Sequence, residues 1–151
     1  MQTITRRQAL ALGSGAAVIL TVGDVSPLFA TPAEADAEIA KFTGGKVAEK
    51  GKISIDLPEI AENGNTVPLS VVVESPMTDK DYISDILVVA DGNPRPGIAT
   101  FHLTPLSGKA TAATRIRLQT TEYIIVVAKT NEGKFFTDRK QVKVTIGGCG
   151  G

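Results

Sequence analysis

The last five residues of this 151-residue chain place a single thiol among glycines. The segment is Gly147-Gly148-Cys149-Gly150-Gly151, and Cys149 is the only cysteine. Glycine has the greatest backbone freedom of any residue, so the segment should be mobile unless something clamps it. Three extended residues beyond Ile146 reach at most about 10 Å. The sequence therefore predicts a short swinging arm, residues 147–151, that carries a solvent-accessible thiol.

Such a thiol is suited to carrying a passenger rather than to catalysis. No His lies beside Cys149 to act as a base, and no second cysteine can resolve a disulfide. Catalysis needs positioned groups, which a mobile nucleophile lacks, whereas small glycines let an arm enter the narrow active site of another protein. The alternative is a disordered tail with an incidental cysteine. An unpaired thiol is a liability in an oxidising compartment, which favours a function for Cys149.

The composition excludes several other kinds of site. One Cys and one His cannot form an intramolecular disulfide, a cysteine-based zinc site or a site with two histidines. Sixteen basic and sixteen acidic residues give a net charge of zero, which argues against a nucleic-acid binder. We therefore expect no metal or cofactor in this chain, and no nucleic-acid partner.

The first thirty residues resemble an export signal. Arg6 and Arg7 precede an uncharged run, residues 8–23, that is diluted by Gly and Ser and too short for a comfortable membrane span. Consecutive arginines indicate the twin-arginine route, which exports folded proteins to the periplasm. Cleavage after Ala30 is one choice, and the alanines at 33, 35 and 37 offer others. An amphipathic surface helix or a retained anchor is the alternative.

A short helix and about seven strands are predicted for residues 31–146. Thr31-Pro32-Ala33-Glu34 is typical of a helix start, and Thr43-Gly44-Gly45 of a helix end, with Ile39 and Phe42 on one apolar edge. The strands are predicted at 52–57, 66–74, 83–90, 97–103, 113–119, 123–130 and 134–146, the last with a bend near Asp138. This pattern predicts an all-β, immunoglobulin-like antiparallel sandwich with a short N-terminal helix.

Two of these strands, 86–90 and 124–128, are apolar on both faces. One face of an antiparallel sheet usually meets water. Either loops or the N-terminal helix cover the second face, or another protein chain buries it. The residues alone leave both explanations open.

Some polar residues have weaker claims to a role. His102 alternates with apolar neighbours and is expected to face solvent, without a metal or acid–base role. Arg115 and Arg117 lie two apart on one strand face, where they form a solvated face or attract an anionic passenger. Charged clusters are expected in a surface loop and at an exposed bend, namely Asp79, Lys80, Asp81 and Asp85, and then Asp138, Arg139 and Lys140.

The chain resembles the SoxY family, the sulfur-carrier subunits of bacterial thiosulfate oxidation. The ending from Val142 to Gly151 is similar to the terminal motif of that family, and Pro58 to Pro68 resembles the stretch before its second core strand. Phe42-Thr43-Gly44-Gly45 and the twin-arginine leader also fit. The resemblance spans essentially the whole chain.

The resemblance implies a function, a site and partners. Cys149 would hold thiosulfate-derived sulfur covalently, in a carrier that is not itself an enzyme. A SoxZ-type β-sandwich subunit would form a heterodimer with the chain and account for the doubly apolar strands. A c-type haem enzyme would conjugate thiosulfate to the carrier, a dimanganese hydrolase would release sulfate, and a molybdenum–haem sulfane dehydrogenase is a further candidate. The metals belong to those partners.

Two other classes of function remain as alternatives. Chains that end in Gly-Gly can be sulfur carriers activated at the terminal carboxylate, but these need a ubiquitin-like fold with a long helix across the sheet. An exported interaction sandwich with an incidental Cys149 is the other. Substitution of Cys149 by serine would abolish only a thiol carrier, and deletion of Gly150-Gly151 would abolish only a carboxylate carrier.

Overall fold

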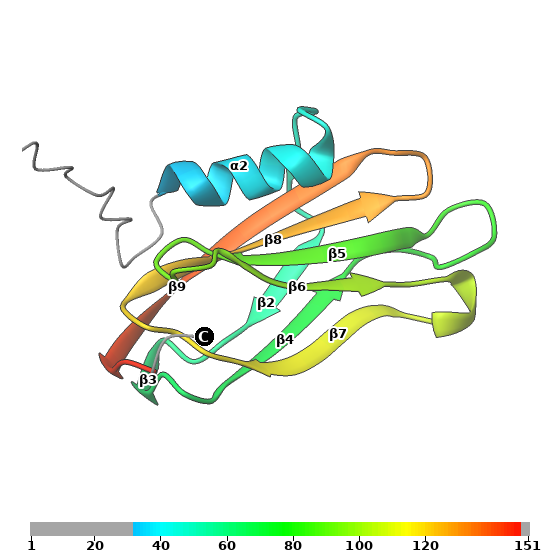
Figure 1. The fold of residues 1–151 in the computed structure, drawn as a ribbon. Coiled ribbons are helices and arrows are strands. Elements are labelled where there is room, and N and C mark those ends of the chain that lie inside the picture. Colours follow the sequence, from blue (N-terminus) through cyan, green and yellow to red (C-terminus); the bar gives the residue numbers. More distant parts are fainter. Residues whose placement is uncertain (1–31, 149–151) are drawn as a thin grey trace, which may run out of the picture.

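Runs of β-branched residues form two sheets that pack face to face in the computed structural model, which describes residues 32–148 (Figure 1). One helix, α2 (Pro32–Thr43), precedes the strands. The strands are β1 (Glu49–Lys50), β2 (Ile53–Asp56), β3 (Ile60–Asn63), β4 (Val67–Val73), β5 (Ile83–Ala90), β6 (Gly97–His102), β7 (Ala110–Ile116), β8 (Glu122–Thr130) and β9 (Phe135–Ile146), with a 3₁₀ turn at Pro105–Ser107. The predicted immunoglobulin-like sandwich with an N-terminal helix is confirmed.

The larger sheet has the order β1-β9-β8-β5-β6, with β3 also paired to β9, and the smaller sheet has the order β2-β4-β7. Most neighbours are antiparallel, as predicted. The pairs β1–β9 and β3–β9 are parallel, which the strand pattern of the sequence did not predict. Because β3 runs alongside the end of β9, the turn after β3 lies beside the start of the C-terminal segment.

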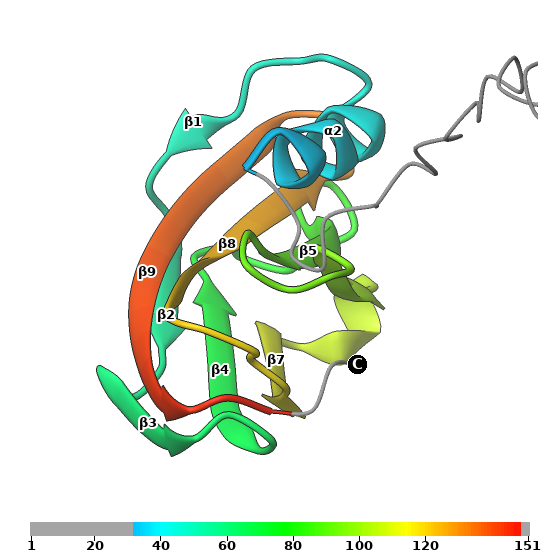
Figure 2. The same cartoon turned by 60° about the vertical axis from the view of Figure 1, so that its left-hand side comes forward.

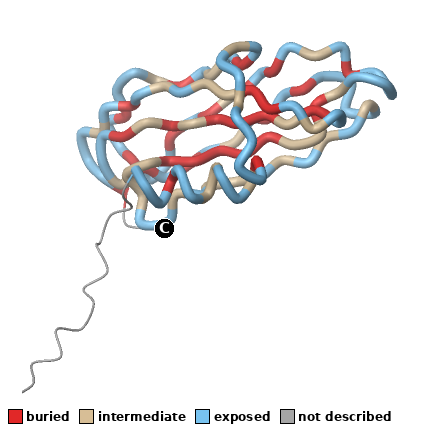
Figure 3. The backbone as a smooth tube through the Cα atoms, turned by 90° about the horizontal axis from the view of Figure 1, so that it is seen from above, coloured by how far each residue is buried: buried red, intermediate tan, exposed pale blue. Residues whose placement is uncertain are grey.

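The core lies between the two sheets, where alternate residues of facing strands meet. In β4, Val71 and Val73 are buried while Val72 is 48% exposed, as their alternation predicts. Ile116 and Leu118 are buried while Arg115 and Arg117 face outward. Figure 3 shows the buried positions running along the middle of the strands, with exposed residues at the turns.

Helix α2 covers the outer face of the larger sheet, across β5 and β8 and on the side away from β2, β4 and β7 (Figure 2). A second apolar cluster lies beneath it, formed by Ala35, Leu87, Val89, Val127 and Phe135, with Ile39 and Phe42 packed at its edge. The rings of Phe42 and Phe135 meet edge to face, with centroids 6.0 Å apart. The helix ends at Gly44 and Gly45, whose positive φ values of 64° and 78° stop it.

This packing decides between the two explanations of the doubly apolar strands. Leu87 and Val89 of β5 and Val127 of β8 are buried by the chain's own helix. The interpretation that a partner subunit accounts for these strands is therefore wrong.

The bounds of β7 and the continuity of β9 differ from the sequence-based predictions because pairing between distant strands sets them. Strand β7 begins at Ala110, three residues early, since Ala110 pairs with Val73 of β4. Strand β9 runs unbroken through Asp138, so the predicted bend there is wrong. Arg139 stacks over the Tyr123 ring at 4.9 Å, and the Lys140 ammonium donates to the Leu57 carbonyl oxygen (2.7 Å). Among residues 32–148, no helix is long and apolar enough to cross a membrane.

Candidate functional site

The start of the C-terminal segment is fixed to the body of the sandwich by two backbone hydrogen bonds, and a third joins the two body residues that hold it. The Gly64 N–H, in the turn after β3, donates to the Ile146 carbonyl oxygen (2.7 Å). The Gly148 N–H donates to the Leu118 carbonyl oxygen (2.8 Å). The Leu118 N–H donates to the Gly64 carbonyl oxygen (2.8 Å). We call this set the clamp: Gly64, Leu118 and the segment 146–148. It joins three segments that are far apart in the sequence.

Glycine is required in the clamp because the backbones approach very closely. A Cβ added to Gly64 would collide with the Leu118 carbonyl oxygen and lie 2.7 Å from the Gly148 nitrogen. A Cβ on Gly147 would collide with the Gln119 carbonyl oxygen. Gly148 is buried in the structure. The first two glycines of the predicted arm are thus held against the body, and the mobility expected from Gly147 onward is not what these two residues show.

The remaining predicted site residues lie outside the described part of the chain. These are Cys149, Gly150 and Gly151, and at the other end the leader 1–30 with Arg6 and Arg7, together with Thr31 of the predicted helix cap. The structure therefore places the last two residues before Cys149, and the surface on which they rest.

That surface continues into a small hollow on the other side of Leu118. The Asn93 amide donates to the Arg117 carbonyl oxygen (2.7 Å) and accepts from the Gln119 N–H (3.0 Å). The strip 117–119 is therefore held by Asn93 on one edge and by the clamp on the other. Beside it is a hollow of about 200 Å³, lined by Asn93, Pro94, Arg95, Gly97, Ile98 and Arg117. The sequence indicated only a Pro/Gly turn here, and nothing local pointed to a site.

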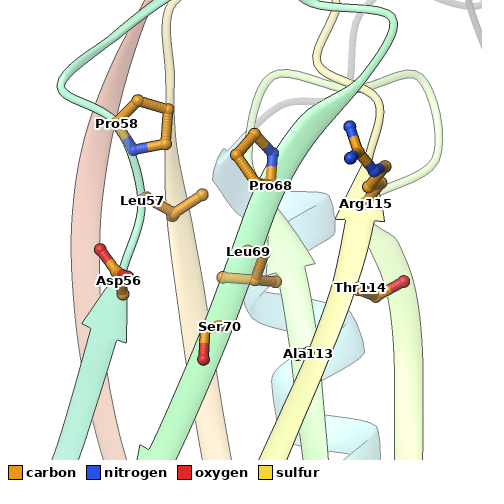
Figure 4. A pocket seen from close by; sticks show the side chains of 9 residues that line it. All are labelled: Asp56, Leu57, Pro58, Pro68, Leu69, Ser70, Ala113, Thr114 and Arg115. Atoms are coloured by element: carbon orange, nitrogen blue, oxygen red, sulfur yellow. The ribbon is translucent and has the colours of Figure 1, made fainter.

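A larger, open hollow lies on the outer face of the smaller sheet (Figure 4). Its volume is about 640 Å³, and Arg115 of β7 and Asp56 at the end of β2 stand on opposite sides of the residues of β4. The Arg115 guanidinium donates to the Thr66 hydroxyl (3.4 Å). Arg115 and Arg117, expected to act together on one strand face, thus line two different hollows.

His102 faces solvent on β6, as predicted, with 77% of its side chain exposed. Its Nδ1 lies 2.5 Å from Oδ1 of Asp85, which belongs to β5 and not to the charged loop predicted from the sequence. The other members of that loop, Asp79, Lys80 and Asp81, are exposed. Within residues 32–148, no group of three His, Cys, Asp or Glu side chains is arranged to hold a metal ion.

Glu122 is a buried carboxyl that contacts Gly92, next to Asn93 of the smaller hollow. Its Oε2 accepts a hydrogen bond from the Gly92 N–H (2.8 Å), while its Oε1 has no partner among the described residues. Only 3% of the residue is exposed, and this burial raises the pKa of the Glu122 carboxyl above its ordinary value of 4.5. The hydrogen bond from Gly92 opposes that rise without cancelling it.

We expect Glu122→Gln to stabilise the protein at neutral pH. The folded state binds the proton of Glu122 more tightly than the unfolded state, so this residue's contribution to the free energy of unfolding falls as the pH rises from below about 4.5 through the folded pKa. A neutral amide avoids the cost of a buried charge and keeps an acceptor for Gly92. The gain at pH 7 should be of the order of 1 kcal/mol and vanish near pH 4, measured by urea unfolding. Parallel pH profiles of the two proteins would contradict this.

Comparison with known proteins gives a consistent picture. The chain matches the family model described as sulfur oxidation protein SoxY over residues 39–149. Among solved structures, it is similar to the sulfur carrier protein SoxY from Chlorobium limicola f thiosulfatophilum, with 32% identity and a TM-score of 0.63 over 76% of this chain and 98% of that chain.

More distant structures share the fold alone. The superoxide reductase (neelaredoxin) from Ignicoccus hospitalis is 19% identical, with a TM-score of 0.56 over 78% of this chain and 95% of that one. The superoxide reductase from Nanoarchaeum equitans is 10% identical, with a TM-score of 0.52 over 64% of this chain and 100% of that one. No curated protein matches the chain.

Proposed function

Since this chain belongs to the SoxY family of sulfur oxidation proteins, whose solved relative is a sulfur carrier, we propose that it holds thiosulfate-derived sulfur covalently on Cys149 in the periplasm. The carrier itself is no catalyst. It brings each intermediate to the enzymes that act on it. Gly147, Gly148, Gly150 and Gly151 form the narrow segment that enters those active sites.

The clamp is the observation that supports this proposal most directly. Gly148 is fixed to Leu118, and the Cα of the next residue follows within one peptide unit, about 3.8 Å. The residue that precedes Cys149 is therefore held at a defined point at one end of the sandwich. Breaking the one hydrogen bond from Gly148 to Leu118 would release Gly147 and Gly148, which add about 7 Å of reach. A carrier needs both states: a defined resting place, and a longer reach during transfer.

The covalent chemistry needs only the thiol from this chain. Conjugation joins the Cys149 sulfur to the sulfane sulfur of thiosulfate: RSH + S₂O₃²⁻ gives RS–S–SO₃⁻, one proton and two electrons. A c-type haem partner enzyme accepts the electrons. Hydrolysis by a dimanganese partner then gives RS–S⁻, sulfate and two protons. A molybdenum–haem sulfane dehydrogenase is proposed to oxidise the remaining sulfur.

A SoxZ-type subunit completes the heterodimer, and the leader with Arg6 and Arg7 exports the pair by the twin-arginine route.

Intact mass spectrometry of the protein from the periplasm of thiosulfate-grown cells tests this function. We expect adducts of sulfur, sulfite or thiosulfate mass that map to the C-terminal peptide and disappear after a thiol reductant. The same spectrum gives the site of leader cleavage. An unmodified Cys149 during thiosulfate turnover would contradict the proposal and favour an interaction module.

A further inference from the structure

We infer that the hollow beside Arg117 is a docking site for the anionic group carried on Cys149. We call it the arginine hollow; it is lined by Asn93, Pro94, Arg95, Gly97, Ile98 and Arg117. The inference rests on the proposed function, because it assumes that Cys149 carries oxidised sulfur. A sulfonate group on a thiol is an anion at neutral pH, so its chemistry identifies the kind of surface that would bind it.

The charges of the arginine hollow suit an anion. Within residues 32–148, the guanidinium groups of Arg95 and Arg117 make no ion pair or hydrogen bond, so their donors are available. Two carboxylates lie near the rim: Oε1 of Glu38 would lie 3.5 Å from a Cβ placed on Gly97, and the buried Glu122 accepts a hydrogen bond from Gly92, next to Asn93. The lining itself holds the two guanidinium groups and no carboxylate. Guanidinium forks bind planar or tetrahedral oxyanions through paired hydrogen bonds.

The hollow and the clamp share one short strip of backbone. Gly148 bonds to the carbonyl oxygen of Leu118 on one edge of the strip 117–119, and Asn93 bonds to Arg117 and Gln119 on the other edge. Gly148 and Asn93 therefore lie on opposite edges of the same three-residue strip. Beyond Gly148, one peptide unit of about 3.8 Å, the cysteine side chain and a thiosulfonate supply the reach for docking across this strip.

The side-chain directions and the volume also fit. Leu118 points into the core and is fully buried, so its neighbour Arg117 points outward, toward solvent. A water molecule occupies about 30 Å³ in the liquid. A hollow of about 200 Å³ therefore accepts a sulfonate and leaves room for some water.

Docking in this hollow would give the loaded carrier a resting state. The anionic group would lie against Arg95 and Arg117 between visits to enzymes, and the uncharged thiol would have no such attraction. Loading itself would thus change how tightly residues 149–151 are held. Because both guanidinium groups are exposed, the attraction should weaken with salt.

Chemical loading in vitro tests the inference. Tetrathionate converts the thiolate to the S-thiosulfonate (RS⁻ + S₄O₆²⁻ gives RS–S–SO₃⁻ + S₂O₃²⁻), and methyl methanethiosulfonate supplies a neutral S-methylthio control. Amide hydrogen exchange of the C-terminal peptide, followed by mass spectrometry, should be about five-fold slower for the anionic adduct. The double variant R95Q/R117Q should abolish the difference, as should 1 M NaCl. The matched variant Arg115→Gln, in the other hollow, should retain it.

Equal exchange rates for the two adducts in the unmodified sequence would overturn the inference. So would an undiminished difference in R95Q/R117Q, with thermal unfolding used to show that this variant is folded. The loading step uses no partner enzyme, so the result does not depend on whether the cell loads Cys149. Failure here alongside sulfur adducts from the periplasm would reject the docking site alone, and absent adducts would reject the carrier function.

Discussion

Replacement of Cys149 by serine should abolish thiosulfate-dependent electron transfer to the proposed haem partner enzyme. The chain has no other cysteine, so no second thiol can take the passenger. A serine hydroxyl is neither a thiolate nor oxidisable to a disulfide-type bond under these conditions. We expect the rate to fall to the background of the enzyme without a carrier, measured as haem reduction with purified carrier, partner enzyme and thiosulfate.

Deletion of Gly150-Gly151 is the matched control for this variant. A thiol carrier should keep its capacity to be loaded, because Cys149 remains and merely becomes the C-terminal residue. A carrier activated at the terminal carboxylate would show the reverse: loss on deletion of the two glycines and normal activity of Cys149→Ser. Equal activity of Cys149→Ser and the unmodified carrier would leave the cysteine incidental.

Local patterns were sufficient to predict most of the sandwich. Strand β5 has the predicted bounds, and the alternation around Val72 and around Arg117 correctly assigned the inward and outward faces. Helix α2 ends where Gly44 and Gly45 indicated. These features depend on residues close together in the sequence, where propensity and periodicity carry the information.

Features set by contacts between distant segments were missed. Strand β3 is short and alternates poorly, and it forms because β9 offers it an edge. The same holds for the burial of Leu87 and Val127 under α2, which periodicity alone could not distinguish from burial by a partner. In each case the deciding partner lies more than forty residues away, so no local signal identifies it.

The candidate site divides in the same way. The glycines around Cys149 are recognisable from their neighbours, and so is the chemistry that a lone thiol permits. The clamp and the arginine hollow depend on bringing Gly64, Asn93 and Leu118 to one place. Gly64 looked like an ordinary turn residue, although the structure shows that it contacts the segment that carries the thiol.

Gly64→Ala should disrupt the clamp. The added Cβ would collide with the Leu118 carbonyl oxygen, and it is backbone, not a flexible side chain, that would have to move. Such overpacking costs about 1–3 kcal/mol. We expect the free energy of unfolding to fall by about 2 kcal/mol in urea titrations. Gly97→Ala is the matched control for stability, since its Cβ would meet its nearest neighbour, Glu38, at an ordinary 3.5 Å. This variant should change the free energy of unfolding by less than about 0.5 kcal/mol.

The position of the strain decides what this variant says about the carrier. If the chain relieves the clash by lifting the segment 146–148 from Leu118, amide exchange at Gly148 should accelerate about ten-fold while the core strands keep their protection. The body would then remain folded with a longer, freer arm, and loading with thiosulfonate would no longer slow exchange in the C-terminal peptide. Unchanged exchange at Gly148, together with lost stability, would instead place the strain in the β3–β4 turn. In that case the clamp would be a by-product of packing rather than the device that positions the thiol.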